Sequence, residues 1–174
     1  DRNLILGTVE EAENLERPPF SRIAYLTQTT LSLDDTADII KVLRRRFPEI
    51  EGPAKDDICY ATQNRQNAVK QISKEVDLVL VVGAENSSNT LRLVEVAESL
   101  GTRAVRIQSS SELQPDLLEE CNKIGITAGA SAPEDIVQGI VDKLRGWNPG
   151  CRVRELKLTE EQVSFGLPPQ LKTP

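Results

Sequence analysis

Short apolar runs alternate along the chain with segments whose apolar residues recur every three or four positions. The strongest run is Leu78 to Val82, and shorter or charge-interrupted runs cover 4–6, 22–26, 103–107 and 123–127. An unbroken aliphatic run is typical of a strand that is buried on both faces of a parallel sheet. The alternation therefore predicts an α/β fold: small, mainly parallel sheets flanked by helices, in quasi-repeated lobes that converge on a central pocket.

Segments with helical spacing lie between these runs. The spacing predicts helices over 9–15, 33–47, 61–72, 91–100, 115–121 and 134–144. The helix that starts near residue 91 is predicted from apolar residues at helical spacing: Leu91, Val94, Ala97 and Leu100. Two of the predicted helices begin with the spacing of a capping box: Ser32 with Asp35, and Ser131 with Glu134.

The polar stretch 51–57 is the predicted internal boundary, because it carries both Gly52 and Pro53. Beyond residue 150 the pattern changes. There 153–158 and 162–165 are expected to be strands of a tail that packs outside the repeated α/β units.

Composition narrows the class of protein. With 174 residues, 39% apolar and 28% charged, the chain is expected to form one or two globular domains. The net charge of −6 argues against a general nucleic-acid binder and against attachment to an anionic membrane surface. No apolar stretch approaches the roughly 20 residues that span a bilayer, so a soluble compartment is expected. The chain has no Met and starts as if inside a longer protein, which points to a fragment.

The absence of histidine excludes Ser-His and Cys-His nucleophilic pairs and His-ligated zinc within these residues. Three cysteines, at 59, 121 and 151, are widely spaced and odd in number. This pattern argues against a disulfide framework and against a self-contained zinc site, and it fits a reducing compartment.

Three polar turns share one design: Thr27 to Thr30, Asn86 to Asn89, and the turn at Ser131. Each follows a predicted strand and opens a predicted helix, where parallel sheets bind ligands and helix N-termini attract anions. Hydroxyls, a carboxamide and backbone amides that converge there would suit a diphosphate. Taken singly, Ser131 is more typical of a helix cap and Thr29 of a structural turn. Cys59 suits a small buried hydrophobe at least as well as a metal ligand.

Four motifs then carry a specific resemblance: 24–36 (AYLTQTTLSLDDT), 55–66 (KDDICYATQNRQ), 81–89 (VVGAENSSN) and 125–133 (GITAGASAP). In sequence and order they resemble the 4-hydroxy-3-methylbut-2-enyl diphosphate reductase family, also called IspH or LytB. On this resemblance, 1–54 are part of a middle α/β lobe, 55–146 are a third lobe, and 147–174 are a C-terminal extension.

The resemblance implies reductive removal of the hydroxyl of an allylic diphosphate, which gives isopentenyl and dimethylallyl diphosphates in the non-mevalonate route. In the family three cysteines hold a [4Fe–4S] cluster, and Cys59 matches one of them. Ser87, Ser88, Asn89 and Ser131 would bind the diphosphate, and Thr29 would serve catalysis near the substrate hydroxyl. A donor such as ferredoxin or flavodoxin would supply electrons, in the cytoplasm or the plastid stroma.

The chain departs from the family in lacking the other two cluster cysteines, the active-site histidines and the proton-donating glutamate. Cys121 and Cys151 do not fall in the family's ligand contexts. These 174 residues alone are therefore expected to bind no stable cluster and to turn over no substrate, unlike the full-length protein. Two other interpretations stay open: a non-enzymatic α/β module that binds a phosphorylated metabolite, and an inactive remnant.

Overall fold

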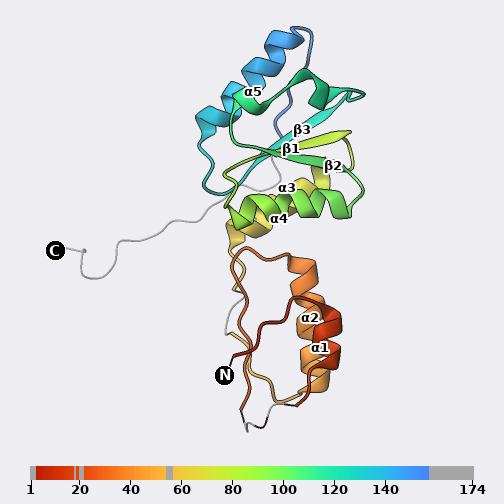
Figure 1. The fold of residues 1–174 in the computed structure, drawn as a ribbon, viewed down its shortest axis with the longest axis vertical. Helices are drawn as coiled ribbons and strands as arrows, with labels where there is room; N and C mark the ends of the chain where they lie inside the picture. The colour runs from red at the N-terminus through yellow and green to blue at the C-terminus, as the bar shows by residue number, and fades with distance from the viewer. Residues whose placement is uncertain (1–2, 18, 20–21, 54–56, 157–174) are drawn as a thin grey trace, which may run out of the picture.

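The computed structural model describes residues 3–17, 19, 22–53 and 57–156. No helix in these ranges combines the length and the apolar character that crossing a bilayer requires. Along the chain (Figure 1) the elements are α1 Val9–Asn14, α2 Leu33–Arg46, α3 Tyr60–Ile72, β1 Leu78–Val82, α4 Ser88–Ser99, β2 Arg103–Ile107, η1 Ser110–Glu112, η2 Pro115–Leu118, β3 Ile124–Ala128 and α5 Glu134–Trp147.

Strand β1 is the centre of a three-stranded parallel sheet in the order β2-β1-β3. Val79 of β1 lies opposite Ala104 of β2 and Gly125 of β3. All five β1 side chains are completely buried. The central position explains the unbroken aliphatic run, because both edges of β1 are paired and both of its faces are covered. The predicted fold class and this strand are confirmed.

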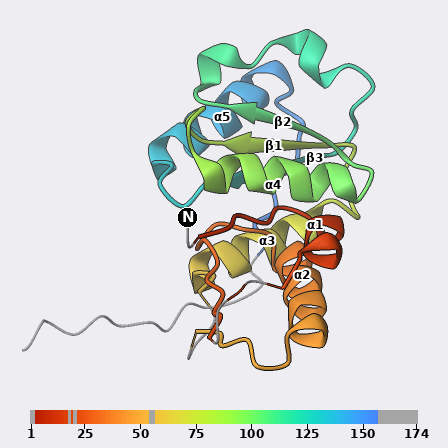
Figure 2. The same cartoon turned by 60° about the horizontal axis from the view of Figure 1, so that its bottom comes forward.

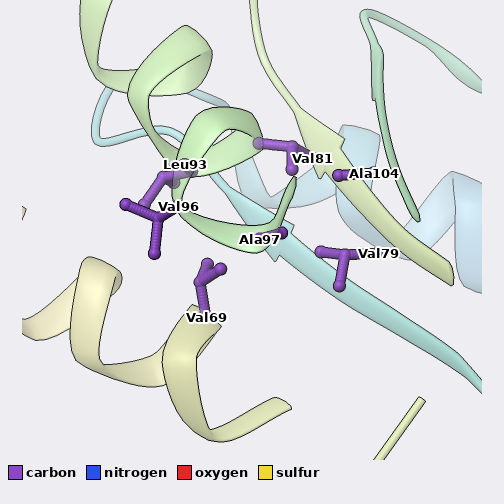
Figure 3. Packing of buried hydrophobic residues seen from close by; sticks show 7 residues of the cluster. All are labelled: Val69, Val79, Val81, Leu93, Val96, Ala97 and Ala104. Atoms are coloured by element: carbon purple, nitrogen blue, oxygen red, sulfur yellow. The ribbon is translucent and has the colours of Figure 1, made fainter. Parts of the chain in front are cut away.

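Alternate side chains of β1 point to opposite faces of the sheet. Val79 and Val81 pack against α3 and α4 in a cluster of Val69, Val79, Val81, Leu93, Val96, Ala97 and Ala104 (Figure 3). On the other face, a second cluster comprises Leu78, Leu80, Val82, Ile107, Leu113 and Ile140 of α5. Figures 1 and 2 show α3 and α4 on one side of the sheet and α5 on the other.

Helix α4 forms where the apolar spacing predicts a helix, but only part of that spacing faces the sheet. Ala97 is buried and Val94 packs against the core, whereas Leu91 and Leu100 are 53% and 49% exposed. The buried residues are Asn89, Thr90, Leu93, Val96 and Ala97. The first two are polar, and a periodicity that counts only apolar residues misses them. The inward face of this helix therefore combines apolar residues with two hydrogen-bonded polar residues at its N-terminus.

The first part of the chain has its own core, in which α1 and α2 bury Ala12, Val42, Leu43 and Phe47. The strands expected at 4–6 and 22–26 do not form among the described residues. Only an isolated parallel bridge between Ala24 and Glu51 is present. A strand needs neighbours that complete its hydrogen-bond ladder, and this segment pairs at a single position.

Two smaller predictions also need correction. The helix expected over 115–121 is a short 3-10 turn, Pro115–Leu118. Residues 153–156 are not a strand, whereas 157–158 and 162–165 lie outside the described residues. Of the capping box predicted for Ser32 with Asp35, the N-cap half is confirmed, because the Ser32 hydroxyl accepts a hydrogen bond from the Asp35 N–H at 3.4 Å.

The carboxylate of Asp77 fastens the start of β1 to the turn before β3. Its Oδ2 accepts hydrogen bonds from the backbone N–H groups of Lys123 at 2.9 Å and Asn122 at 2.8 Å. The hydrogen bond from Lys123 has the larger effect, and the two bonds together hold the pKa of Asp77 below its usual value of 3.8. Since the folded-state pKa is lowered, the stabilisation is complete above the unfolded-state pKa and is lost as the pH falls through the folded-state value.

We therefore expect Asp77→Asn to lower the urea midpoint at neutral pH and to flatten its decline between about pH 5 and pH 2. Urea denaturation across this range measures both effects. Asp116→Asn, at an exposed position in η2, is the control and should leave the profile unchanged. An acid decline equally steep with and without the Asp77 carboxylate would contradict the expectation.

Candidate functional site

The carboxamide of Asn89 joins three elements at the carboxyl edge of the sheet. Its Nδ2 donates to Oγ1 of Thr62 in α3 at 3.1 Å, and its Oδ1 accepts from the backbone N–H of Ala130 at 3.3 Å. Asn89 is 7% exposed and Thr62 is 3% exposed. A buried amide that is bonded on both sides holds its neighbours in one arrangement. Asn89 therefore ties α3 and the turn after β3 to the start of α4.

The loop before α2 is fastened to the start of α3. Oδ2 of Asp57 accepts hydrogen bonds from the backbone N–H and the hydroxyl of Thr27, at 2.9 and 3.3 Å. Two residues further along both segments, the Cys59 N–H donates to the Thr29 carbonyl at 3.2 Å. Thr29 and Cys59, 30 positions apart in the sequence, are thus direct neighbours.

Cys59 is the N-cap residue of α3, a helix of 13 residues, and its side chain makes no capping hydrogen bond. The thiol is exposed, so the alternative of a small buried hydrophobe is wrong for this residue. Free N–H groups and the helix dipole favour negative charge at such a position. A sulfur placed there is suited to bind a metal as a thiolate.

The three serines of the predicted site have different environments. Ser87 is the half-buried N-cap of α4, and its Oγ accepts from the N–H of Thr90 at 3.2 Å. Ser88 and Ser131 are exposed. The capping box of Ser131 with Glu134 is wrong, because α5 starts at Glu134 with Pro133 as its N-cap. A capping box with Ser131 as N-cap would require the helix to start at residue 132, so the Ser131 hydroxyl does not cap it.

Two glycines bring α4 close to the ends of the strands. A Cβ on Gly83, after β1, would lie 2.2 Å from Thr90 Oγ1, and one on Gly129, after β3, would lie 2.3 Å from the same atom. The Gly129 Cβ position is also 3.7 Å from Ser87 Oγ. Ser87 therefore lies against the turn that carries Ser131, and any larger residue at either glycine would displace the helix.

The predicted site residues thus form two corners that α3 connects. Thr29 and Cys59 form one corner, and Ser87 to Asn89 with the turn of Ser131 form the other. Thr62 lies about one helical turn beyond Cys59, so a single rigid helix sets the separation of the corners. Hydroxyls and amides at a helix N-terminus suit an oxyanion, and an exposed thiol suits a metal.

Four buried or half-buried polar residues of the site were not predicted: Thr62, Arg65, Gln66 and Thr90. Arg65 donates through Nε to the Ala128 carbonyl at 3.0 Å, and Gln66 donates to the Leu31 carbonyl at 2.8 Å. The available signal was positional. Thr62 and Thr90 each follow a site residue, Cys59 or Ser87, by three positions, which places them on the same side of a helix.

The described residues fit the role of a single ligand of an iron–sulfur cluster and do not form a complete ligand set. Nowhere in the described ranges do three or more His, Cys, Asp or Glu side chains gather closely enough to hold a metal ion. Cys121 packs against the α5 side of the sheet, and Cys151 follows α5. Cys59 is therefore the one thiol placed at the site, and iron–sulfur clusters require several thiolates.

A cavity of about 720 Å³ lies in the first part of the chain and is separate from these corners. Its lining comes from residues between Asn3 and Ile50 and includes apolar side chains such as Leu6, Ile23 and Leu43. Thr27 reaches it, but Cys59, Ser87 and Asn89 do not line it. This cavity is therefore not the polar pocket expected where the lobes converge.

Comparison with known proteins gives a consistent result. The family model described as "LytB protein" matches residues 1–145. Among curated relatives, the 4-hydroxy-3-methylbut-2-enyl diphosphate reductase of Acidithiobacillus ferrooxidans is 53% identical over 165 residues, covering 94% of this chain and 52% of the relative. The enzyme of the same name from Pseudomonas putida strain GB-1 is 50% identical over 163 residues, covering 94% of this chain and 51% of the relative.

A solved structure agrees with these relatives. That of the E-1-hydroxy-2-methyl-but-2-enyl-4-diphosphate reductase from Plasmodium falciparum is similar with a TM-score of 0.85 at 34% identity, covering 96% of this chain and 53% of that one. The chain thus spans about half the length of the relatives it matches. The family match over residues 1–145 establishes that the chain belongs to the LytB protein family.

Proposed function

We propose that this chain supplies the carboxyl-terminal part of a reductase that converts 4-hydroxy-3-methylbut-2-enyl diphosphate to isopentenyl and dimethylallyl diphosphates. Two electrons and two protons enter, the allylic C–O bond breaks, and the oxygen leaves as water. The observation that carries the proposal is the Asn89 junction, which binds the sulfur-bearing helix α3 to the hydroxyl-bearing turns. Relatives that carry this enzyme name at 50–53% identity support it.

The diphosphate end of the substrate is assigned to Ser87, Ser88, Asn89 and Ser131. The N-terminus of α4 contributes unpaired N–H groups and a partial positive charge to the same corner. Thr29, exposed and bonded to Cys59 through its backbone, is assigned to the substrate hydroxyl and to proton delivery there. Clamping the charged end fixes the position of the reacting C–O bond relative to the sulfur corner.

Cys59 is assigned as one ligand of a [4Fe–4S] cluster, with the other thiolates outside these 174 residues. When bound, the cluster supplies electrons and Lewis acidity. A low-potential carrier such as ferredoxin or flavodoxin in the cytoplasm or plastid stroma is the proposed electron source. The proposed boundary between 1–54 and 55–146 is supported by the apolar clusters: one uses residues 6–50, and the others use residues 69–144. The extension 147–174 is proposed from the family resemblance.

The proposal is tested in a full-length reductase in which these residues supply the matched half, for example beside the other half of the A. ferrooxidans enzyme. After anaerobic reconstitution with iron and sulfide, we expect substrate to give both products when a reduced dye supplies electrons. The 174 residues alone, treated identically, should retain no stable cluster and form no product, because one thiolate is too few.

For each part of this experiment, one result would contradict the proposal. A cluster-loaded full-length protein that leaves the substrate unchanged would refute the proposed reaction. Tight binding of a phosphorylated metabolite without iron would instead favour a non-enzymatic module. A stable, stoichiometric cluster in the 174-residue chain would refute the assignment of ligands outside it.

A further inference from the structure

Thr90 occupies a slot that two glycines leave open. It is completely buried in the first turn of α4. Its hydroxyl fills the space that side chains at Gly83 and Gly129 would need. Cβ atoms added to these glycines would lie 2.2 and 2.3 Å from Thr90 Oγ1. The ends of β1 and β3 are therefore shaped around this one side chain.

The hydroxyl of Thr90 bonds to the hydroxyl of Ser87. Thr90 donates through Oγ1 to Ser87 Oγ at 2.9 Å, and its backbone N–H donates to the same oxygen at 3.2 Å. A serine hydroxyl has two acceptor lone pairs and one hydrogen to donate. Thr90 thus uses both acceptor positions of Ser87. The remaining hydrogen of Ser87 must point away from Thr90, from a half-buried position at a helix N-terminus.

We propose that Thr90 is a positioning residue that fixes Ser87 as a hydrogen-bond donor toward an oxyanion and thereby raises the affinity of this site for diphosphate. The inference rests on the proposed function and adds a residue that never touches the ligand. Without the Thr90 hydroxyl, the Ser87 hydroxyl is free to rotate and loses part of its donation to the anion. A donor that is oriented before binding loses less free energy when the ligand arrives.

Two variants separate the Thr90 hydroxyl from the rest of its side chain. Thr90→Ser keeps the hydroxyl and loses the methyl group, whereas Thr90→Ala loses both, so the two variants differ by one oxygen atom. Both are smaller than threonine and cannot clash in the slot. In the full-length, cluster-loaded protein, we expect Thr90→Ala to raise the Kd for inorganic diphosphate about 3- to 10-fold, because hydrogen bonds to charged groups are the stronger ones.

Thr90→Ser should stay within about twofold of the unchanged protein. The KM for the allylic diphosphate should follow the Kd in both variants, with kcat almost unchanged, since the effect is on binding of the non-reacting end. Calorimetric titration with inorganic diphosphate measures the Kd, and anaerobic turnover gives the split between KM and kcat. Equal Kd values for the Ala and Ser variants would overturn the inference.

A double-mutant cycle tests whether Thr90 acts through Ser87. Ser87→Ala alone is expected to raise the Kd about tenfold, and adding Thr90→Ala should then change it by less than about twofold. Independent, multiplying effects would mean that Thr90 only fills space, and the inference would fail. If Ser87→Ala leaves the Kd unchanged, the diphosphate site itself is wrongly assigned, which is a failure of the proposed function.

Discussion

Cys59→Ser is expected to reduce product formation at least about a hundredfold in the full-length reductase and to lower its iron content. Groups that only orient a metal ligand are worth about 10- to 100-fold in affinity or activity, so removal of a ligand should cost at least as much. The position supports a large effect, because Cys59 is exposed, is the N-cap residue of α3 and lies beside Thr29. Iron, acid-labile sulfide and turnover are measured on anaerobically reconstituted protein.

The chain supplies two matched controls for this change. Cys121 and Cys151 are also free thiols, but Cys121 packs on the α5 side of the sheet and Cys151 follows that helix. Cys121→Ser and Cys151→Ser should keep full iron content and turnover. Full iron and activity in Cys59→Ser, or loss of the cluster in either control, would place the ligand elsewhere.

Helix α3 contacts both groups of predicted site residues, Thr29 with Cys59 and Ser87 to Asn89, and so fixes their separation. Its N-cap carries the thiol, its first turn carries Thr62, and Thr62 receives the hydrogen bond from Asn89. Arg65, one turn further, holds the end of β3 through the Ala128 carbonyl. A shift of α3 would therefore move the sulfur and break contacts to both polar turns at once, so the geometry is specified by buried polar contacts as well as by apolar packing.

The sequence predicted the sheet well for a physical reason. The β1 run is continuous because that strand is central, and the charges in 103–107 mark the less buried strand β2. Local signals also predicted most helix positions, including the cap at Ser32. The predicted strands at 4–6 and 22–26 fail because pairing depends on residues distant in the sequence, which periodicity does not report.

Part of the candidate site was also predictable from the sequence, and part was not. The polar turns were predictable from strand and helix ends, but the family resemblance alone assigned roles to Thr29 and Cys59. Thr62 and Thr90 were missed because each is a buried polar residue whose hydrogen bonds make its position favourable. Apolar spacing also leaves out Asn89 and Thr90 from the inward face of α4, although both are buried there.

Gly129→Ala is expected to destabilise the fold by about 1–3 kcal/mol, the usual cost of overpacking a core. The added Cβ would lie 2.3 Å from Thr90 Oγ1, and the threonine cannot move away because Gly83 confines it from the other side. A branched side chain in a helix also has little rotamer freedom. Urea denaturation measures the change in free energy of unfolding, and diphosphate binding should weaken as α4 is displaced.

A second substitution tests whether the Thr90 hydroxyl is the cause of the strain in Gly129→Ala. With Thr90→Ala in the same chain, the nearest atom of residue 90 to the new Cβ is its own Cβ at 3.5 Å, an ordinary contact, so most of the lost stability should return. Diphosphate affinity should stay low, because the hydroxyl that orients Ser87 is gone. Gly146→Ala, whose Cβ position meets nothing within 4 Å, should be neutral or stabilising by up to about 1 kcal/mol. If the double variant is no more stable than Gly129→Ala, strain against Thr90 is not the cause, and the glycine serves the backbone of the turn instead.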